Sequence, residues 1–428
     1  MAFELKRYLV RVVQNTNLYP VARQLYKRLD LERAYYPKNK DNLGEIVAFQ
    51  DVPVVPYDSL LERFCGLSVH QGGPIWPHWS EQVDARHCRN LSPVDDCPRY
   101  PESITETIEA PVIWGGAICS HFGHQIADFC TRLMHAKSVY PDATFLFAAK
   151  STADVKTLAQ TPAFFRAILD WYGIQPPQVK IVSQPLLAKQ LLVAPQAEQL
   201  SNYGPSHRYL EIMDAHIEQK LTPKLTQKAV YISRGGMANC FAGEPYIELL
   251  MREVGIKVIR PETLPLQQQL TEYVSSEQLI FSAGSAVHAL QLLGRFKADV
   301  QIINRRSKGR LAKNMIEMRS SSLTYLDSIE TTLHGYMPSG LANDWDGITI
   351  HNEDRLIASL YSIAPKLKQL WNSTAYREQR DRDITNWLKR ETQPGKSLSS
   401  ASSRQIIRQL KKAGVPHLIP SLEQYLQA

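Results

Sequence analysis

Residues 228–303 alternate short apolar runs with segments of helix length, and this alternation limits the possible folds more than any other feature of the chain. Runs this short and apolar are typical of the buried strands of a parallel sheet that helices cover on both faces. The pattern predicts strands at 228–233, 256–259, 279–281 and 300–303, and helices at 245–255, 266–274 and 286–293. We therefore expect a Rossmann-like half in this part of the chain.

A less regular alternation precedes it, with strands predicted at 144–148, 179–182 and 191–193 and a helix over 120–140. A chain of 428 residues is too long for one ordinary core. The expected fold is α/β, with two Rossmann-like halves facing a cleft, an extra N-terminal segment and a helical C-terminal tail. The expected domains are a basic helical and Pro-rich irregular or short-stranded segment at 1–105, the two halves at 106–225 and 226–310, and a helical extension at 311–428.

Composition narrows the class of protein. The net charge of +7 is modest for this length and the basic residues are scattered, so no nucleic-acid partner is expected. The six cysteines have no regular spacing and form no C-x-x-C pair, which makes a reduced cytoplasmic compartment the simplest interpretation. Charges interrupt the apolar residues of 1–17, so we expect neither a signal peptide nor a membrane span there.

Residues 1–40 hold nine Lys or Arg against three Asp or Glu, with leucines and valines at helical spacing. Two interpretations stay open. The commoner one is a helix docked on the body of the protein by its apolar stripe. The other is a basic amphipathic surface that binds anionic lipid, which would give a peripheral contact with the inner membrane.

The polar stripe of the helix predicted over 120–140 carries histidines, an aspartate and an arginine, whereas a surface helix ordinarily carries solvated Lys and Glu there. At about 100° per residue, these side chains fall on one stripe, and the opposite stripe is apolar. The members of the polar stripe are His121, His124, Asp128, Arg132 and His135. The pattern indicates an acid/base surface.

Other candidates follow the predicted strands 228–233, 256–259 and 279–281, because ligands of α/β sheets bind beyond the carboxyl ends of the strands. Arg234 and the turn with Gly284 and Ser285 suit a diphosphate, and Glu262 suits ribose hydroxyls. His288 lies on the helix after that turn. Each has an ordinary alternative. Arg234 could form a surface salt bridge, the turn could be a simple connection of small residues, and Glu262 could be a solvated loop residue.

Metal and dinucleotide motifs are weak or absent. Asp344-Trp345-Asp346 has the D-x-D form but is expected in a turn far beyond the parallel strands, and His70, His78, His87 and Cys88 lack zinc-ligand spacing. Neither G-x-G-x-x-G nor G-x-x-x-x-G-K-[ST] occurs, which argues against dinucleotide oxidoreductases and P-loop enzymes. No metal and no cofactor is expected.

Several motifs, taken in order and spacing, resemble glycosyltransferase family 61, the transferases of capsular-polysaccharide type. The resemblance covers roughly residues 110–305. It rests on Gly115-Gly116, His121-Phe122-Gly123-His124, Tyr231-Ile232-Ser233-Arg234, Glu244, Gly255, Pro261-Glu262, Leu264, Gln269 and 282–288. The turn 282–286 departs from the Gly-x-His-Gly-Ala pattern of many members and resembles a bacterial branch with G-S-A-x-H, in which His288 takes part of the missing histidine's place.

The resemblance implies a GT-B-like enzyme that builds a bacterial surface polysaccharide. It implies a nucleotide-sugar donor held by the C-terminal half, a glycan or lipid-linked glycan acceptor, inverting transfer of a hexosyl or pentosyl group and no obligatory metal. Such a transfer needs a base for the acceptor hydroxyl and cationic groups for the diphosphate. His124, oriented by Asp128, is the expected base and His121 the reserve, with Arg234, Glu262, Gly284, Ser285 and His288 on the donor side.

Two alternatives keep the same fold. One is a transferase that moves a pyruvyl group or an acidic sugar. The other is a non-catalytic carbohydrate-binding protein, for which the altered turn 282–286 argues.

Overall fold

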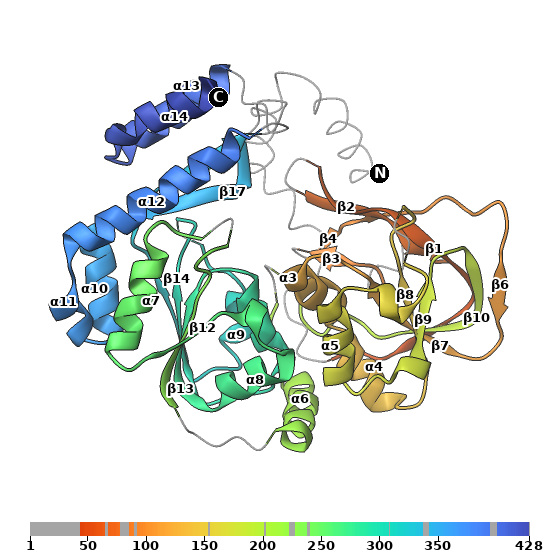
Figure 1. The fold of residues 1–428 in the computed structure, drawn as a ribbon. Helices are drawn as coiled ribbons and strands as arrows, with labels where there is room; N and C mark the ends of the chain where they lie inside the picture. Colours follow the sequence, from red (N-terminus) through yellow and green to blue (C-terminus); the bar gives the residue numbers. More distant parts are fainter. Residues whose placement is uncertain are drawn as a thin grey trace. The chain divides into compact units, whose positions relative to one another are not determined.

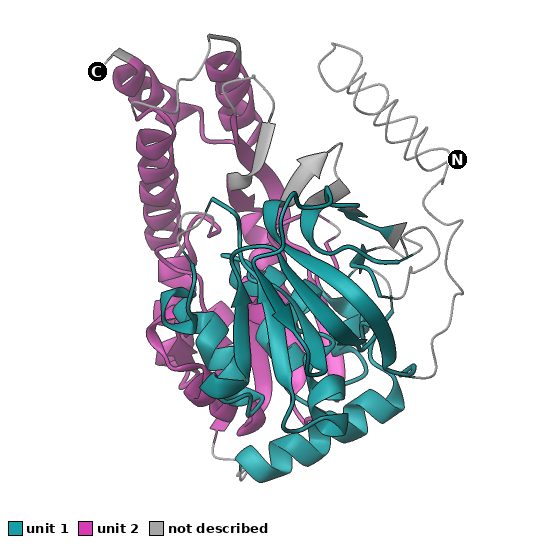
Figure 2. Ribbon diagram, turned by 90° about the vertical axis from the view of Figure 1, so that its right-hand side faces the viewer, with its two compact units in different colours: residues 1–222, 288–295, 312–319 teal, residues 223–287, 296–311, 320–428 magenta. Residues whose placement is uncertain are grey.

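The computed structural model describes residues 43–64, 67–77, 85–89, 92–152, 155–200, 203–221, 227–237, 240–307, 309–336, 342–393 and 400–427. The basic amphipathic surface predicted at residues 1–40 lies outside the described residues. The chain divides into two compact units (Figure 2). Unit 1 comprises Met1–Thr222, His288–Arg295 and Ala312–Arg319, and unit 2 comprises Pro223–Val287, Phe296–Leu311 and Ser320–Ala428.

Unit 1 is built on a mixed sheet with the strand order β5-β2-β1-β10-β7-β8-β9, in which β6 also pairs with β10. The neighbours β10, β7, β8 and β9 are parallel, whereas β1 runs antiparallel to both β10 and β2. Strands β3 and β4 form a separate antiparallel pair. The strands of the unit are β1 (Val47–Phe64), β2 (Leu67–Pro74), β3 (Cys88–Arg89), β4 (Ser92–Pro93), β5 (Asp95–Asp96), β6 (Glu106–Ile108), β7 (Val112–Ala117), β8 (Thr144–Ala148), β9 (Val179–Val182) and β10 (Leu186–Val193).

The long strand β1 is the main departure from the sequence prediction, which expected irregular or short-strand structure in the Pro-rich residues 41–105. It has 18 residues and contains Pro53 and Pro56. The carbonyl oxygen of Pro53 accepts the N–H of Ile75 (2.8 Å), so Pro53 bonds as an acceptor, and Pro56 falls where the register between β1 and β2 shifts. Proline is tolerated at such irregular positions because no ladder N–H is needed there.

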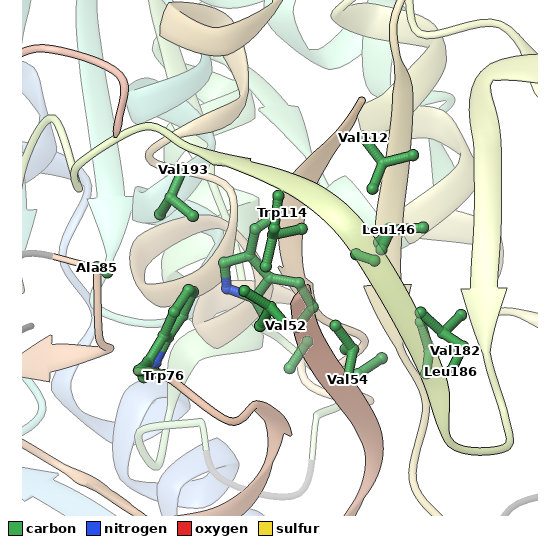
Figure 3. Close-up of a cluster of buried hydrophobic side chains, with 14 of the residues drawn as sticks. Val52, Val54, Trp76, Ala85, Val112, Trp114, Leu146, Val182, Leu186 and Val193 are labelled. Atoms are coloured by element: carbon green, nitrogen blue, oxygen red, sulfur yellow. The ribbon is translucent and has the colours of Figure 1, made fainter. Parts of the chain in front are cut away.

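Figure 3 shows the core of unit 1, where side chains of neighbouring strands pack on one face of the sheet. Trp114 of β7 lies among Val52 and Val54 of β1, and all three side chains are buried. Leu146 and Leu186 continue the cluster along β8 and β10. On the opposite face Phe147 packs edge-on against Phe165 of α5, with ring centroids 5.1 Å apart. Burial on both faces explains why these strands read as nearly continuous apolar runs.

The helices of unit 1 are short. They are α3 (Phe122–His124), the π-helix η2 (Gln125–Phe129), α4 (Leu133–Val139), η3 (Leu158–Gln160), α5 (Ala163–Trp171), η4 (Pro176–Gln178), α6 (His207–Lys220) and α9 (Lys313–Ile316), together with the part of the 3-10 helix η6 (Ser285–Leu292) that begins at His288. Two buried contacts hold the segments His288–Arg295 and Ala312–Arg319 against the rest of unit 1. Trp171 Nε1 donates to the carbonyl oxygen of Leu292 (2.9 Å), and Arg319 forms an ion pair with Glu198 (2.8 Å).

Unit 2 contains the parallel sheet that the alternation at 228–303 predicts, with the order β12-β11-β13-β14-β15. In Figure 1, helices α7, α10 and α11 lie on one side of this sheet and α8 on the other. Consistently, Ile280 packs with Ile247 of α7, whereas its neighbour Phe281 meets Tyr273 of α8, with ring centroids 5.5 Å apart. The strands are β11 (Gln227–Ile232), β12 (Lys257–Ile259), β13 (Ser276–Ser282), β14 (Asp299–Ile303) and β15 (Ser322–Leu326), and the helices between them are α7 (Glu244–Glu253), the 3-10 turn η5 (Pro261–Thr263) and α8 (Leu266–Val274).

The α/β fold class is thus confirmed by parallel sheets and packed helices. The predicted helical tail is confirmed from residue 353 onward, but the strands between 322 and 351 were not predicted. The remaining elements are the antiparallel pair β16 (Ile329–Tyr336) and β17 (Ala342–His351), then α10 (Glu353–Ile363), α11 (Lys366–Leu370), α12 (Ser373–Glu391), α13 (Ser400–Lys412), η7 (Pro416–Leu418) and α14 (Ile419–Gln427). Among the described helices, none has both the length and the apolar composition needed to cross a bilayer.

Candidate functional site

The first group of candidate residues follows the carboxyl end of β7 in unit 1. A fully buried side chain fixes the turn there: Gln125 Oε1 accepts the N–H of Cys119 (2.7 Å), and Nε2 donates to the carbonyl oxygen of Ala117 (3.2 Å). The exposed His121 caps the first turn of α3, where its Nδ1 accepts the N–H of His124 (3.3 Å). Residues at this edge of an α/β sheet are well placed to meet a ligand.

The helix predicted over residues 120–140 is interrupted. It consists of α3, the π-helical η2 and, after a break at 130–132, α4. The N–H of Cys130 bonds to the carbonyl oxygen of Gln125 (2.9 Å), five residues back, which widens the turn. A constant rotation of about 100° per residue therefore does not hold here, because the π turn holds more residues than an α turn.

The polar stripe predicted on that helix is largely covered by protein. Asp128, Arg132 and His135 are only 2%, 3% and 7% exposed. Arg132 donates to the carbonyl oxygens of Ala85 (3.2 Å) and Arg86 (3.5 Å), so the segment 85–89 lies over this stripe. Only His121 and His124 keep solvent contact among the stripe residues.

Asp128 is the centre of this group. His124 Nδ1 lies 2.8 Å from Asp128 Oδ2, which is the pairing expected from the sequence. Arg89 of β3 donates from Nε to Oδ1 (2.6 Å) and from Nη2 to Oδ2, so its guanidinium grips the carboxylate with two nitrogens. His87 Nε2 lies 3.4 Å from Oδ1. A buried carboxylate thus meets one guanidinium and two imidazoles.

The electrostatics favour an ionised Asp128. Burial alone would raise the pKa of its carboxyl, but the charge of Arg89 and hydrogen bonds from His124, His87 and Arg89 outweigh it and hold the pKa well below the ordinary value. Burial lowers the pKa of His87, although Asp128 opposes that shift. His87 is therefore neutral near pH 7, and Arg89 supplies the positive charge opposite Asp128.

His288 belongs to the same unit and is buried. Its Nδ1 lies 2.7 Å from Gln291 Oε1, and because an amide oxygen only accepts, Nδ1 carries the proton and Nε2 keeps a lone pair. Burial lowers the pKa of His288 to about 4, and Asp128, His124 and His121 contribute to its electrostatic environment. His288 is a neutral imidazole at pH 7. It offers an acceptor rather than the positive charge that a phosphate would need.

The second group of candidate residues lies at the carboxyl ends of the parallel strands of unit 2. Arg234 follows β11, is 5% exposed and lies against the turn after β13. A Cβ atom on Gly284 would stand 2.2 Å from Arg234 Nη1. Ser285, half-buried, begins η6 directly after that glycine. The structure thus brings Arg234, Gly284 and Ser285 to one edge of the sheet.

Two buried glutamates hold the backbone around Arg234. Glu244 Oε1 accepts the backbone N–H of Arg234 (2.8 Å) and the hydroxyl of Tyr231 (3.0 Å). Glu248 Oε1 accepts the hydroxyl of Ser233 (2.5 Å), and Arg260 binds the same carboxylate (3.0 Å). Glu244 thus fixes the backbone at Arg234, and its charge also acts on the guanidinium of Arg234.

A second guanidinium, Arg305, follows β14 and was not singled out in the sequence. Its Nε donates to the carbonyl oxygen of Ala283, and its own carbonyl oxygen accepts the hydroxyl of Thr349 (2.7 Å). Burial, then repulsion from Arg234 and Arg306, lowers the pKa of Arg305 to about 9. The side chain remains charged at pH 7. Two cationic side chains therefore hold the turn 283–284 from different strands.

Glu262 lies on η5 after β12, at the same edge of the sheet, and is exposed. It is an electrostatic neighbour of Arg234. Glu262 therefore follows the strand after which the sequence analysis expected it, and its side chain is exposed to solvent. The sequence did contain a signal for Arg305, because Arg305 follows an apolar strand just as Arg234 does. Arg89 had no such signal, since it lies in a two-residue strand of the Pro-rich part of the chain.

Metal-binding candidates gain no support from the described residues, where no three His, Cys, Asp or Glu side chains are arranged to hold an ion. Asp344-Trp345-Asp346, which the sequence predicted in a turn, lies in strand β17. His78 lies outside the described residues.

Residues 122–295 match the family described as Glycosyltransferase 61. The matched range contains His124, Asp128, Arg234, Glu262 and the turn 282–286, and it excludes Arg89 and Arg305. This match confirms the resemblance expected from the motifs. No curated protein matches the chain.

Proposed function

We propose that this chain, a glycosyltransferase of family 61, inverts the anomeric carbon of a nucleotide sugar and passes the sugar to a surface-polysaccharide acceptor without a metal ion. Family membership supports the transferase activity. The donor, the acceptor, the stereochemistry and the independence from metal are the parts that we propose.

The pairing of His124 with Asp128 carries the proposal. With the Nδ1 proton held by Asp128 at 2.8 Å, Nε2 has a lone pair that can take the proton of an acceptor hydroxyl. The acceptor oxygen then forms a bond to the anomeric carbon as the bond from that carbon to the phosphate oxygen breaks. A single displacement of this kind inverts the configuration. His121, whose ring centroid lies 4.7 Å from that of His124, is proposed as the reserve base.

The group around Arg234 suits the departing diphosphate. Arg234 and Arg305 supply positive charge, and the turn with Gly284 and Ser285 supplies backbone N–H groups at the start of η6. Guanidinium groups bind phosphate oxygens with two nitrogens at once and can offset the charge that develops on the leaving group. Glu262, on the loop after β12, would accept ribose hydroxyls of the donor.

In this proposal unit 1 activates the acceptor and unit 2 holds the donor, which is the division of labour of a GT-B-like enzyme. His288 then acts with unit 1, where its Nε2 lone pair accepts a hydrogen bond from a substrate hydroxyl. We further propose a cytoplasmic protein that meets a lipid-linked acceptor at the inner membrane, for which the basic composition of residues 1–40 argues.

The test is release of nucleotide from a panel of UDP-, GDP-, dTDP- and CMP-sugars, with and without EDTA, in the presence of lipid and glycan acceptors. We expect one donor to be cleaved equally well with EDTA, and NMR of the product to show an inverted anomeric centre. Loss of activity with EDTA would refute metal independence and direct attention to Asp344-Trp345-Asp346. Nucleotide binding without turnover on any acceptor would favour the carbohydrate-binding alternative.

A further inference from the structure

Strand β17 belongs to unit 2 but lies beyond the matched range 122–295, and its C-terminal part is buried on both faces. Ile348 and Ile350 pack with residues of α12 and α13, and Figure 1 shows β17 running beside α12. Because side chains alternate along a strand, Thr349 and His351 lie on the opposite face, where they are 2% and 3% exposed. A buried hydroxyl costs free energy unless it forms a hydrogen bond, so Thr349 needs a partner on that face.

Thr349 bonds to two different loops. Its hydroxyl donates to the carbonyl oxygen of Arg305 (2.7 Å), in the loop after β14. Its own carbonyl oxygen accepts the N–H of Ala242 (2.8 Å), and Phe241 pairs with Thr349 in an isolated parallel bridge. One buried residue of β17 therefore connects the loop that carries Arg305 with the segment just before α7.

The segment before α7 leads to the backbone of Arg234. Phe241 and Ala242 are fully buried, and they lie just before α7, which begins at Glu244. Oε1 of Glu244 accepts the backbone N–H of Arg234 (2.8 Å). The bonds of Thr349 thus connect the backbones of the two arginines that we propose as ligands of the diphosphate.

Of these two arginines, Arg305 depends on Thr349 directly. It lies beyond the end of β14 at Ile303, outside the ladder of paired strands, and the Thr349 hydroxyl fixes its carbonyl oxygen. The guanidinium of Arg305 donates from Nε to the carbonyl oxygen of Ala283. A guanidinium binds phosphate through a planar set of N–H groups, so its orientation decides whether two nitrogens meet the phosphate oxygens. A displaced backbone at Arg305 would change that orientation.

We propose that Thr349 is a positioning residue whose hydroxyl holds the backbone of Arg305, so that the Arg305 guanidinium meets the phosphate farther from the nucleoside. The inference rests on the proposed role of Arg305 in binding the diphosphate. It adds a residue of the C-terminal extension, beyond the matched range, to the donor side of the enzyme. Valine has the shape of threonine without the hydroxyl, and serine keeps the hydroxyl without the methyl group, so the role of this one atom can be tested.

The first experiment measures binding of UDP, GDP and dTDP, and of the matching monophosphates, to the full-length protein by calorimetric titration. In Thr349→Val we expect diphosphate affinity to fall about threefold to tenfold, as for one lost hydrogen bond, and monophosphate affinity to stay within about twofold of wild type. A merely structural role would lower both affinities or neither. Thr349→Ser should restore the wild-type ratio of the two affinities.

The matched control is Thr271→Val on α8. It removes a hydroxyl that also donates to a backbone carbonyl oxygen, that of Gln267 (2.8 Å), at an exposed position. Both affinities should stay at the wild-type values in this variant.

Arg305→Gln shows whether Thr349 acts through Arg305. In that background Thr349→Val should weaken diphosphate binding little further, because the guanidinium that the hydroxyl positions is already gone. Additive losses would overturn the inference, and so would unchanged binding in folded Thr349→Val when Arg305→Gln weakens it. If Thr349→Val does not fold, Thr349→Cys takes its place in the same comparison, because a thiol is only a weak donor.

A second measurement needs no nucleotide and separates the two levels of the proposal. In protein labelled with ¹⁵N-arginine, the Nε–H signal of Arg305 is assigned by its absence in Arg305→Lys. In Thr349→Val we expect this signal to shift and to exchange faster with water, whereas an unchanged signal would contradict the positioning role. If the signal changes but neither Thr349→Val nor Arg305→Gln weakens diphosphate binding, Thr349 does position Arg305 and the proposed diphosphate site is wrong.

Discussion

Gly284 and Arg234 are in direct contact, and a Cβ atom at residue 284 would come within 2.2 Å of Nη1 of the guanidinium. The Cδ and Cζ atoms of Arg234 would also lie within 2.6 and 2.7 Å of that Cβ. The turn after β13 and the side chain after β11 can therefore occupy these positions only because residue 284 is glycine. The two strands are neighbours in the parallel sheet, so this contact positions the guanidinium at the sheet edge.

Gly284→Ala should consequently displace the Arg234 guanidinium while the sheet remains folded. We expect the affinity for the nucleotide-sugar donor to fall about tenfold, which corresponds to ~1.4 kcal/mol. Calorimetric titration with the donor found in the panel measures the change. The control is Ala289→Gly on η6, which also changes the protein by one methyl group. Gly255→Ala would not serve, because Gly255 has a φ of 80°, at which alanine is strained. Unchanged donor affinity in Gly284→Ala would separate this turn from the donor site.

Arg305 should distinguish a diphosphate from a monophosphate. A charge-assisted hydrogen bond is worth about 1.5–3 kcal/mol, so Arg305→Gln should weaken nucleoside diphosphate binding by about tenfold to a hundredfold. The monophosphate should lose less, because we expect Arg234 to hold the phosphate nearer the nucleoside. The matched control is Arg310→Gln, an exposed arginine that pairs with Asp327 at 2.9 Å. Equal losses for both nucleotides would mean that Arg305 contacts the phosphate that both share, and no loss for either would place Arg305 outside the diphosphate site.

Replacement of the proposed base should affect turnover and not donor binding. General bases contribute about 10²–10⁴ to the rate, so kcat of His124→Ala should fall by that factor while donor affinity stays within about twofold of wild type. His121→Ala should lower kcat less. His207→Ala, an exposed histidine at the start of α6, serves as the control. Turnover of His124→Ala within a few-fold of wild type would show that another group is the base.

The sequence predicts unit 2 better than unit 1, and the physical reason lies in how local the signals are. The strands β11, β13 and β14 are buried on both faces, so their apolar runs and the helix ends at Pro245 and Gly255 identify them without any long-range information. The rule that ligands meet the carboxyl ends of such strands then leads directly to Arg234 and the turn 283–285.

The part of the candidate site around Asp128 depends on contacts that no local pattern reports. The periodicity at 120–140 assumes a regular α-helix, and the π turn at 125–129 changes which residues share a face. Arg89 precedes Asp128 by 39 residues and reaches it from the separate pair of β3 and β4. Strand β1 was not predicted because its prolines argue against a strand, and the sequence does not show that Pro53 bonds as an acceptor and that Pro56 falls at a register shift.

Removing one partner of the buried ion pair between Arg319 and Glu198 should destabilise unit 1. Both side chains are at most 1% exposed, and Arg319 also donates to the carbonyl oxygens of Leu293 (3.0 Å) and Met315 (2.6 Å). Arg319→Met leaves a buried carboxylate without a cation and should lower the free energy of unfolding by about 3–5 kcal/mol in urea titrations. Arg319→Met with Glu198→Leu should recover much of that loss.

The exposed pair of Arg208 and Glu211 offers the comparison for this prediction. Its side chains are 71% and 55% exposed, so water screens the attraction. Arg208→Met should change the free energy of unfolding by less than about 1 kcal/mol. A loss in Arg319→Met no larger than that in Arg208→Met would mean that the buried carboxylate is relieved by rearrangement or by protonation.

Asp128 should make the protein sensitive to acid. Its pKa in the folded protein is held well below the ordinary value, because the charge of Arg89 and the bonds from His124 outweigh the effect of burial. A carboxyl in the unfolded chain has a pKa of about 3.9, so the stabilisation from Asp128 is complete above that pH and is lost as the pH falls toward the lower, folded-state pKa. In that window the unfolded state binds a proton that the folded state does not, which costs about 1.4 kcal/mol of unfolding free energy per pH unit. Asp128→Asn should therefore be less stable at pH 7 but show a shallower decline below about pH 4. Parallel slopes for wild type and Asp128→Asn in acid would mean that Asp128 is not preferentially ionised in the folded protein.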